Sequence, residues 1–188
     1  MHCKKILNTA LAVGLLVLTG CASKHPLETP LGQSSFQEYL AETRAWIAEN
    51  RHFVMDDHEK ELTYHTPFEI RPAGKTDKGI LLIHGLGDSP WTYRDLAPKL
   101  AEQGMLVRTV LLPGHGTKPA DMIGVTSEDW NKAVQEQIDL LKKEVPNVWL
   151  GGFSTGGNLA FSHAAEDPDI RGLILFSPAI EIRTKLVE

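Results

Sequence analysis

Ser154 lies in the pattern Gly-x-Ser-x-Gly, which spans residues 152–156. A serine in this pattern can attack a carbonyl carbon when it stands on a sharp turn between a strand and a helix. The turn closes only if the residues two places away on either side have almost no side chain, and Gly152 and Gly156 meet this requirement. A serine that only caps a helix after a glycine-rich turn could have the same sequence. The elements on either side therefore distinguish a nucleophile from a capping residue.

A second glycine-rich turn, residues 84–88, reads His-Gly-Leu-Gly-Asp and follows a short apolar run. An acyl-transfer enzyme needs two backbone N–H groups that point at the oxygen on which negative charge develops. We expect Thr155, the residue after the serine, to supply one of these groups and Leu86 to supply the other. We expect His84, at the start of the turn, to order the loop rather than to act as the general base.

Apolar runs alternate with helical patterns through most of the chain, which predicts an α/β fold with a mostly parallel sheet and helices on both faces. Strands are expected at residues 79–83, 105–112, 148–153 and 172–176. Helices are expected at residues 90–103, 127–144 and 155–166. Ser154 therefore falls between a strand and a helix, as a nucleophile on a sharp turn requires.

Capping residues predict where two of the helices begin. Asp88 or Ser89 is expected to cap the helix at 90–103, and Pro98 is expected to kink it. Before the first strand, a capping box that begins at Ser35 predicts a helix over 35–49. Its aromatic stripe is more typical of a core face than of a ligand site. Residues 62–70 are expected to be extended.

Three motifs together resemble the α/β-hydrolase superfamily: His-Gly-Leu-Gly at 84–87, Leu-Pro-Gly-His-Gly at 112–116 and Gly-Phe-Ser-Thr-Gly-Gly at 152–157. The second motif resembles the branch of monoacylglycerol lipases, carboxylesterases, lysophospholipases and serine aminopeptidase-like enzymes. The resemblance covers about residues 60 to 180. It implies hydrolysis of an acylglycerol, lysophospholipid or small acyl ester through an acyl-enzyme on Ser154, with no metal or organic cofactor. His115 is then expected near the cleft rim in a structural role.

The same resemblance implies a catalytic acid and a histidine that follow the serine in the chain. His163 is nine residues along the same predicted helix, about 13 Å away at 1.5 Å per residue, and cannot reach back to Ser154. Asp167 and Asp169 lie at the far end of that helix. We therefore expect a fold that is incomplete at its C-terminal side, and a truncated chain that is inactive alone because the triad acid and base are missing.

The N-terminal residues resemble a bacterial lipoprotein signal. A short basic segment and an apolar run are followed by Leu-Thr-Gly-Cys at 18–21, which is similar to the lipobox. The resemblance implies a lipid on Cys21, cleavage before it and a membrane anchor in the bacterial cell envelope. Ala22 favours the outer membrane. An uncleaved signal anchor is the alternative, although the apolar run is short for a membrane span.

These observations divide the chain into a signal peptide at 1–20, a lipid-anchored tether at 21–34 and the N-terminal part of a hydrolase domain at 35–188. The 188 residues suffice for one domain. A formal net charge of −5 argues against nucleic acid as a partner. The two cysteines, Cys3 and Cys21, form neither a disulfide framework nor a zinc site.

Three other functions are considered. A dinucleotide-binding turn at 85–87 would need a small residue where Pro90 stands and an acidic residue where Leu112 and Pro113 stand. A lipid-anchored binding protein without catalysis remains open, because no triad acid or base follows Ser154 at a suitable place. Amide hydrolysis by the same residues also remains open, as does the oligomeric state.

Overall fold

The computed structural model describes residues 28–179, which form a five-stranded sheet in the order β1-β3-β2-β4-β5. The strands are β1 (Glu69–Ile70), β2 (Lys78–Ile83), β3 (Leu106–Val110), β4 (Asn147–Phe153) and β5 (Ile170–Phe176). β1 is antiparallel to β3, and all other neighbours are parallel. The predicted signal peptide and Cys21 lie outside the described residues. No helix within 28–179 is both long and apolar enough to span a bilayer.

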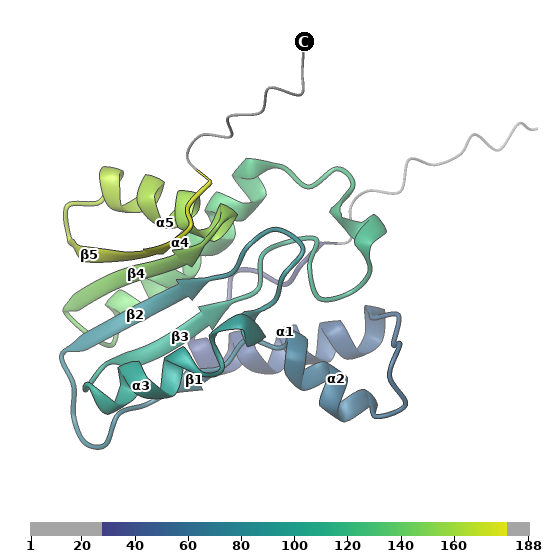
Figure 1. Cartoon of the computed structure of the whole chain (residues 1–188), viewed down its shortest axis with the longest axis horizontal. Coiled ribbons are helices and arrows are strands. Elements are labelled where there is room, and N and C mark those ends of the chain that lie inside the picture. Colours follow the sequence, from purple (N-terminus) through teal and green to yellow (C-terminus); the bar gives the residue numbers. More distant parts are fainter. Residues whose placement is uncertain (1–27, 180–188) are drawn as a thin grey trace, which may run out of the picture.

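Helices cover both faces of the sheet (Figure 1). One face packs against α3 (Leu96–Glu102) and the 3-10 turn η1 (Pro90–Tyr93). The other face packs against α1 (Phe36–Asn50), α4 (Ser127–Lys142) and α5 (Thr155–Glu166). This arrangement confirms the predicted fold class. Among the described residues, no strand pairs with the outer edge of β5.

The core follows from the alternation of side chains along the central strands. Ile80 and Leu82 of β2 belong to the cluster under α3, and Leu81 and Ile83 belong to the cluster under α4 and α5. All four side chains are fully buried. Each buried aliphatic side chain of this size contributes about 1.5–3 kcal/mol relative to an exposed one. A continuous apolar run is therefore what a strand covered on both faces requires.

The prediction of an extended segment at 62–70 is wrong over residues 62–65. Residues 58–65 form the helix α2 (His58–His65); Thr66 has extended backbone angles, and Glu69–Ile70 form the strand β1. The side chain of Asp57 accepts a hydrogen bond from the N–H of Lys60 and caps this helix. The local cap outweighs the β-forming side chains that follow Leu62.

The prediction of one helix at 90–103 is also wrong, because η1 and α3 are separate. The side chain of Ser89 makes no capping hydrogen bond, and Asp88 accepts only from the N–H of Ser89. Pro98 is the third residue of α3, where its missing N–H has no intrahelical partner to lose. Pro98 therefore does not kink this helix.

The predicted capping box of α1 is only half formed. The hydroxyl of Ser35 accepts from the N–H of Glu38, but the Glu38 carboxylate accepts from Ser34 instead of closing back on Ser35. The cap of α4 is complete: Thr126 and Asp129 each accept from the other's backbone N–H. Both helices start within a residue of where the sequence places them.

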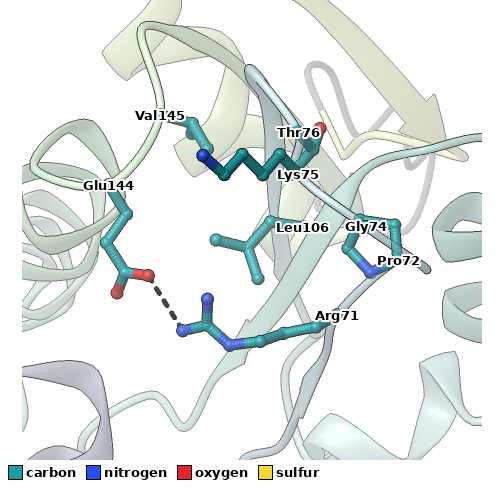
Figure 2. A pocket seen from close by; sticks show the side chains of 8 residues that line it. All are labelled: Arg71, Pro72, Gly74, Lys75, Thr76, Leu106, Glu144 and Val145. Carbon is teal, nitrogen blue, oxygen red and sulfur yellow. Dashed lines mark hydrogen bonds and ion pairs between the residues drawn. The ribbon is translucent and has the colours of Figure 1, made fainter.

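Charged side chains join the elements at the end of the sheet where the parallel strands begin. Arg108 of β3 is fully buried and pairs with Glu69 and Glu144, and Arg71 pairs with the same two carboxylates. Figure 2 shows Arg71 and Glu144 facing each other beside a pocket of about 360 Å³, which Leu106 also lines. Ligands of open α/β sheets bind at the opposite, carboxyl ends of the strands. The cluster is therefore read as structural.

A second ion pair connects the α1–α2 hairpin, residues 36–65, to the rest of the domain. The buried carboxylate of Glu61 accepts from Arg51 Nε at 2.6 Å and from the N–H groups of Val54 and Met55. Burial alone would raise the pKa of Glu61, but these donors together lower it. Arg51 Nη1 also donates to the carbonyl of Gly116 at 2.9 Å. The pair thus fixes the hairpin against the loop after β3.

Glu61→Gln is expected to lower the melting temperature by roughly 5 °C or more, because it leaves the mostly buried guanidinium of Arg51 without a counter-ion. Glu59→Gln is the matched control on the same helix. Its carboxylate pairs with Arg44 but is largely exposed, so a change below about 2 °C is expected. Thermal unfolding followed by circular dichroism compares the two variants. Equal shifts would contradict this role of Glu61.

Candidate active site

Ser154 stands on a strained turn between β4 and α5. Its backbone angles are φ 52° and ψ −118°, in the positive-φ region that residues other than glycine rarely adopt. Such strain persists only where the surroundings impose it, and it is common at functional sites. The sharp strand-to-helix turn expected from the sequence is therefore present.

The two flanking glycines are required by close backbone contacts. A Cβ atom on Gly152 would lie 2.1 Å from the carbonyl oxygen of Gly156. A Cβ on Gly156 would lie 2.0 Å from the carbonyl oxygen of Ile83, at the end of β2. Both contacts are with backbone atoms, which cannot rotate away. The turn at Ser154 is thus pressed against the end of the neighbouring strand.

Hydrogen bonds hold the backbone of Ser154 but leave its hydroxyl free. Its N–H donates to the carbonyl of Phe176 at 3.0 Å, and its carbonyl accepts from Gly157 N at 2.9 Å and Asn158 N at 3.2 Å. The side chain is half-buried, and Oγ makes no hydrogen bond with any residue in 28–179. The oxygen is available at the carboxyl end of the sheet.

The loop that carries Leu86 lies beside this turn. β2 and β4 are neighbours, and Ile83 pairs with Gly152. A Cβ on Gly85 would lie 3.0 Å from the ring of Phe153, the residue before Ser154. The N–H groups of Leu86 and Thr155 donate no hydrogen bond to another described residue. The structure brings the two predicted oxyanion donors to the same end of adjacent strands, and neither N–H is bonded within residues 28–179.

His84 is occupied by backbone on both ring nitrogens. Nε2 accepts from the N–H of Leu112 at 3.1 Å, which places the proton on Nδ1, 2.8 Å from the carbonyl of Gly85. Burial, and then the nearby His115, lower the pKa of His84 to about 3. The Gly85 carbonyl shares its trans peptide with the Leu86 N–H, so a donor on the carbonyl turns that N–H the opposite way. His84 therefore orders the loop, as expected from the sequence.

His115 holds the other side of the same loop. Its Nε2 accepts from the N–H of Gly87 at 3.1 Å, while Nδ1 is 3.2 Å from the carbonyls of Leu112 and Pro113. Burial lowers its pKa, and its ring packs edge-on against His84 at 4.8 Å. The sequence predicted a structural role for His115 but not this bond to Gly87. Two neutral histidines thus bracket Leu86.

His163, Asp167 and Asp169 lie away from the serine. His163 Nδ1 is 3.2 Å from the side-chain oxygen of Gln135 on α4, and Lys142 donates to both carboxylates. None of the histidines in 28–179 hydrogen bonds to Ser154 Oγ. Within this range, no group of three His, Cys, Asp or Glu side chains is arranged to hold a metal ion. The described residues therefore place no hydrogen-bonded general base at Ser154.

Lowering the pH from 6.5 to 4.5 is expected to destabilise the protein. His84 is neutral when folded, with a pKa of about 3, and ordinary when unfolded, so the unfolded chain binds the extra proton below pH 6.5. The contribution of His84 to stability is fully present above that pH. As the pH falls below 6.5, the free energy of unfolding decreases by up to about 1.4 kcal/mol per pH unit for such a histidine. Urea unfolding at pH 7.5, 6 and 5 measures the slope. His84→Asn should make it shallower, whereas a flat profile for the unmodified protein would contradict the assignment.

Comparison with known proteins identifies the family. A family model described as serine aminopeptidase, S33, matches residues 74–188, which is more than half of the chain. The chain belongs to this family. The match contains all three motifs that resembled the hydrolases, and it favours bond hydrolysis over dinucleotide binding. Residues 28–73, with α1 and α2, lie outside the matched range.

Individual relatives agree with the family assignment. The chain is 36% identical over 104 residues to a thermostable monoacylglycerol lipase of Bacillus sp. strain H-257, and 29% identical over 112 residues to a carboxylesterase of Bacillus subtilis strain 168. These alignments cover 55% and 59% of the chain, and 42% and 45% of the two relatives. The chain therefore matches less than half of the length of each relative.

Solved structures match the fold over a similar range. One comes from a study of LipS and LipT, two metagenome-derived lipolytic enzymes, with a TM-score of 0.58 and 29% identity. The match covers 63% of this chain and 48% of the solved chain. MenH from S. aureus has a TM-score of 0.52 at 24% identity, over 63% of this chain and 44% of that one, and supports the fold alone. The described residues are part of an α/β-hydrolase fold.

Proposed function

We propose that the protein hydrolyses carboxylic esters through an acyl-enzyme on Ser154. One observation carries the proposal: a strained serine with a free hydroxyl stands beside two backbone N–H groups that have no partner in the described residues. Attack by Oγ on an ester carbonyl carbon forms the new carbon–oxygen bond, passes the hydroxyl proton to a general base and moves negative charge onto the carbonyl oxygen. The N–H groups of Leu86 and Thr155 stabilise that oxygen.

The remaining steps restore the serine. The tetrahedral intermediate collapses, the bond to the alcohol oxygen breaks, and the alcohol leaves with a proton from the general base. Water then attacks the acyl-enzyme and passes one of its protons through the base to Oγ, which leaves as the acid is released. The base lies outside residues 28–179, so we expect residues 28–179 alone to be inactive.

The substrate class follows from the relatives named above, a monoacylglycerol lipase and a carboxylesterase. We propose an acylglycerol, a lysophospholipid or a small acyl ester, with amide hydrolysis as the alternative. Release of acid from matched hexanoyl esters and hexanoyl amides tests this choice in the protein at its full natural length. Faster turnover of the amides would replace the ester proposal.

A non-catalytic binding protein is a second candidate, because the hydrogen bonds of His84, His115 and His163 are made to groups other than Ser154 Oγ. A folded full-length protein that neither hydrolyses esters nor reacts with a fluorophosphonate would favour this candidate.

We also propose that a lipid on Cys21 anchors the protein in the bacterial outer membrane, with residues 21–34 as the tether. Two or more acyl chains give stable anchoring. Metabolic labelling with radioactive palmitate should mark the protein and not Cys21→Ser. Equal labelling of both would reject this site.

A further inference from the structure

We propose that a pocket between the α1–α2 hairpin and the Leu86 loop binds a hydrocarbon chain of the ester. The proposal rests on the proposed function and names a specificity element for it. The pocket has a volume of about 490 Å³, within the usual range for small-molecule sites. Leu86 and Gly87 line one side, and Val54 and His65 of the hairpin line another.

The position of the pocket connects it with the proposed chemistry. The Leu86 N–H is the proposed oxyanion donor, and the Leu86 side chain is 59% exposed where the pocket lies. An ester carbonyl bound at that N–H is therefore within a few bonds of the pocket. A chain attached to the carbonyl carbon or to the alkoxy oxygen could enter it.

The wall of the pocket suits an uncharged chain. Val54 is 78% exposed, and Met122 and Pro119 add apolar surface. Of the charged side chains that line it, Arg51 is paired with Glu61 and the Gly116 carbonyl, Lys118 with Asp121, and Asp88 accepts from the Ser89 N–H. Burial, and then the positive charge of Arg51, lower the pKa of His65 to about 4, so this side chain is neutral near pH 7. The apolar surface and the neutral imidazole therefore favour an uncharged chain.

One wall of the pocket lies outside the segment that matches the family model. Residues 28–73 precede the segment that matches the family model, yet Arg51 ties them to the loop at Gly116. Two walls of the pocket thus have different origins: the loop belongs to the family segment, and the hairpin does not. Changes in the hairpin should alter chain preference without changing the reaction.

The test uses the full-length protein and Val54→Glu, with Ile123→Glu as the matched control. Both positions are 78% exposed, so neither substitution threatens folding, but Ile123 does not line the pocket. One series varies the acyl chain, with p-nitrophenyl acetate and hexanoate. The other varies the alkoxy chain, with ethyl and hexyl acetate. The readout is the ratio of kcat/KM for the six-carbon ester to that for the two-carbon ester.

We expect Val54→Glu to lower this ratio roughly tenfold in one of the two series and to leave the two-carbon ester unchanged. The affected series identifies whether the acyl or the alkoxy chain enters. Unchanged ratios, or an equal fall in Ile123→Glu, would overturn the proposal. If the protein hydrolyses no ester, the proposed function fails, and titration with 1-hexanol decides the pocket separately. Amide NMR shifts at Gly87 and Gly116 that weaken in Val54→Glu support it, and their absence rejects it.

Discussion

Alanine at position 156 is expected to prevent stable folding. The new Cβ would lie 2.0 Å from the carbonyl oxygen of Ile83 and 2.5 Å from that of His84, both backbone atoms of the adjacent strand end. Either α5 or β2 must shift, and each is held by the core. We expect a loss of about 4 kcal/mol or more, at the upper end for single substitutions, seen as insoluble protein or a much lower urea midpoint.

The matched control is Gly157→Ala, one residue further along the same helix. A Cβ at position 157 would meet Pro178 Cβ at 3.0 Å, so a smaller adjustment suffices. We expect soluble, folded protein with a modest loss of stability. If Gly156→Ala were as stable as this control, the close packing of the Ser154 turn against β2 would be wrong.

Ser154→Ala is expected to lower ester hydrolysis by about 10⁴-fold or more in the full-length protein, because the covalent step has no other nucleophile. The strained backbone at residue 154 suits alanine no worse than serine, so the fold should persist. Ser162→Ala on the exposed side of α5 is the control and should retain full activity. Circular dichroism and initial rates with p-nitrophenyl hexanoate measure both effects. A Ser154→Ala protein with more than about a tenth of the activity would show that another residue attacks the ester.

The sheet and the turn at Ser154 could be predicted because their signals are local. A continuous apolar run such as Ile80 to Ile83 suits only an element that is buried on both sides. Glycines two places before and after a serine permit a sharp strand-to-helix turn that residues with larger side chains would block. The order of the motifs along the chain then placed Leu86 and Ser154 on the same edge. Parallel strands present their carboxyl ends together, so no tertiary detail was needed.

The errors arose where a helix cap or a side-chain contact outweighs the pattern of apolar residues. Leu62 begins a stretch that favours a strand, but the Asp57 cap and the pairing of Glu61 with Arg51 make it helical. No proline or glycine stands between η1 and α3, so the sequence does not indicate that the helix is interrupted there. Gly87 and His115 are far apart in sequence, so their hydrogen bond required the structure. The pocket beside Val54 could not be predicted either, because residues far apart in the sequence line it.

The most direct test of the central claim is the site of fluorophosphonate attachment in the full-length protein. The reagent is attacked by an activated serine, and peptide mass spectrometry locates the adduct. We predict a single adduct on Ser154, absent from Ser154→Ala and retained in Ser162→Ala. An adduct on another residue, or none in a protein that hydrolyses esters, would contradict the assignment of Ser154 as the nucleophile.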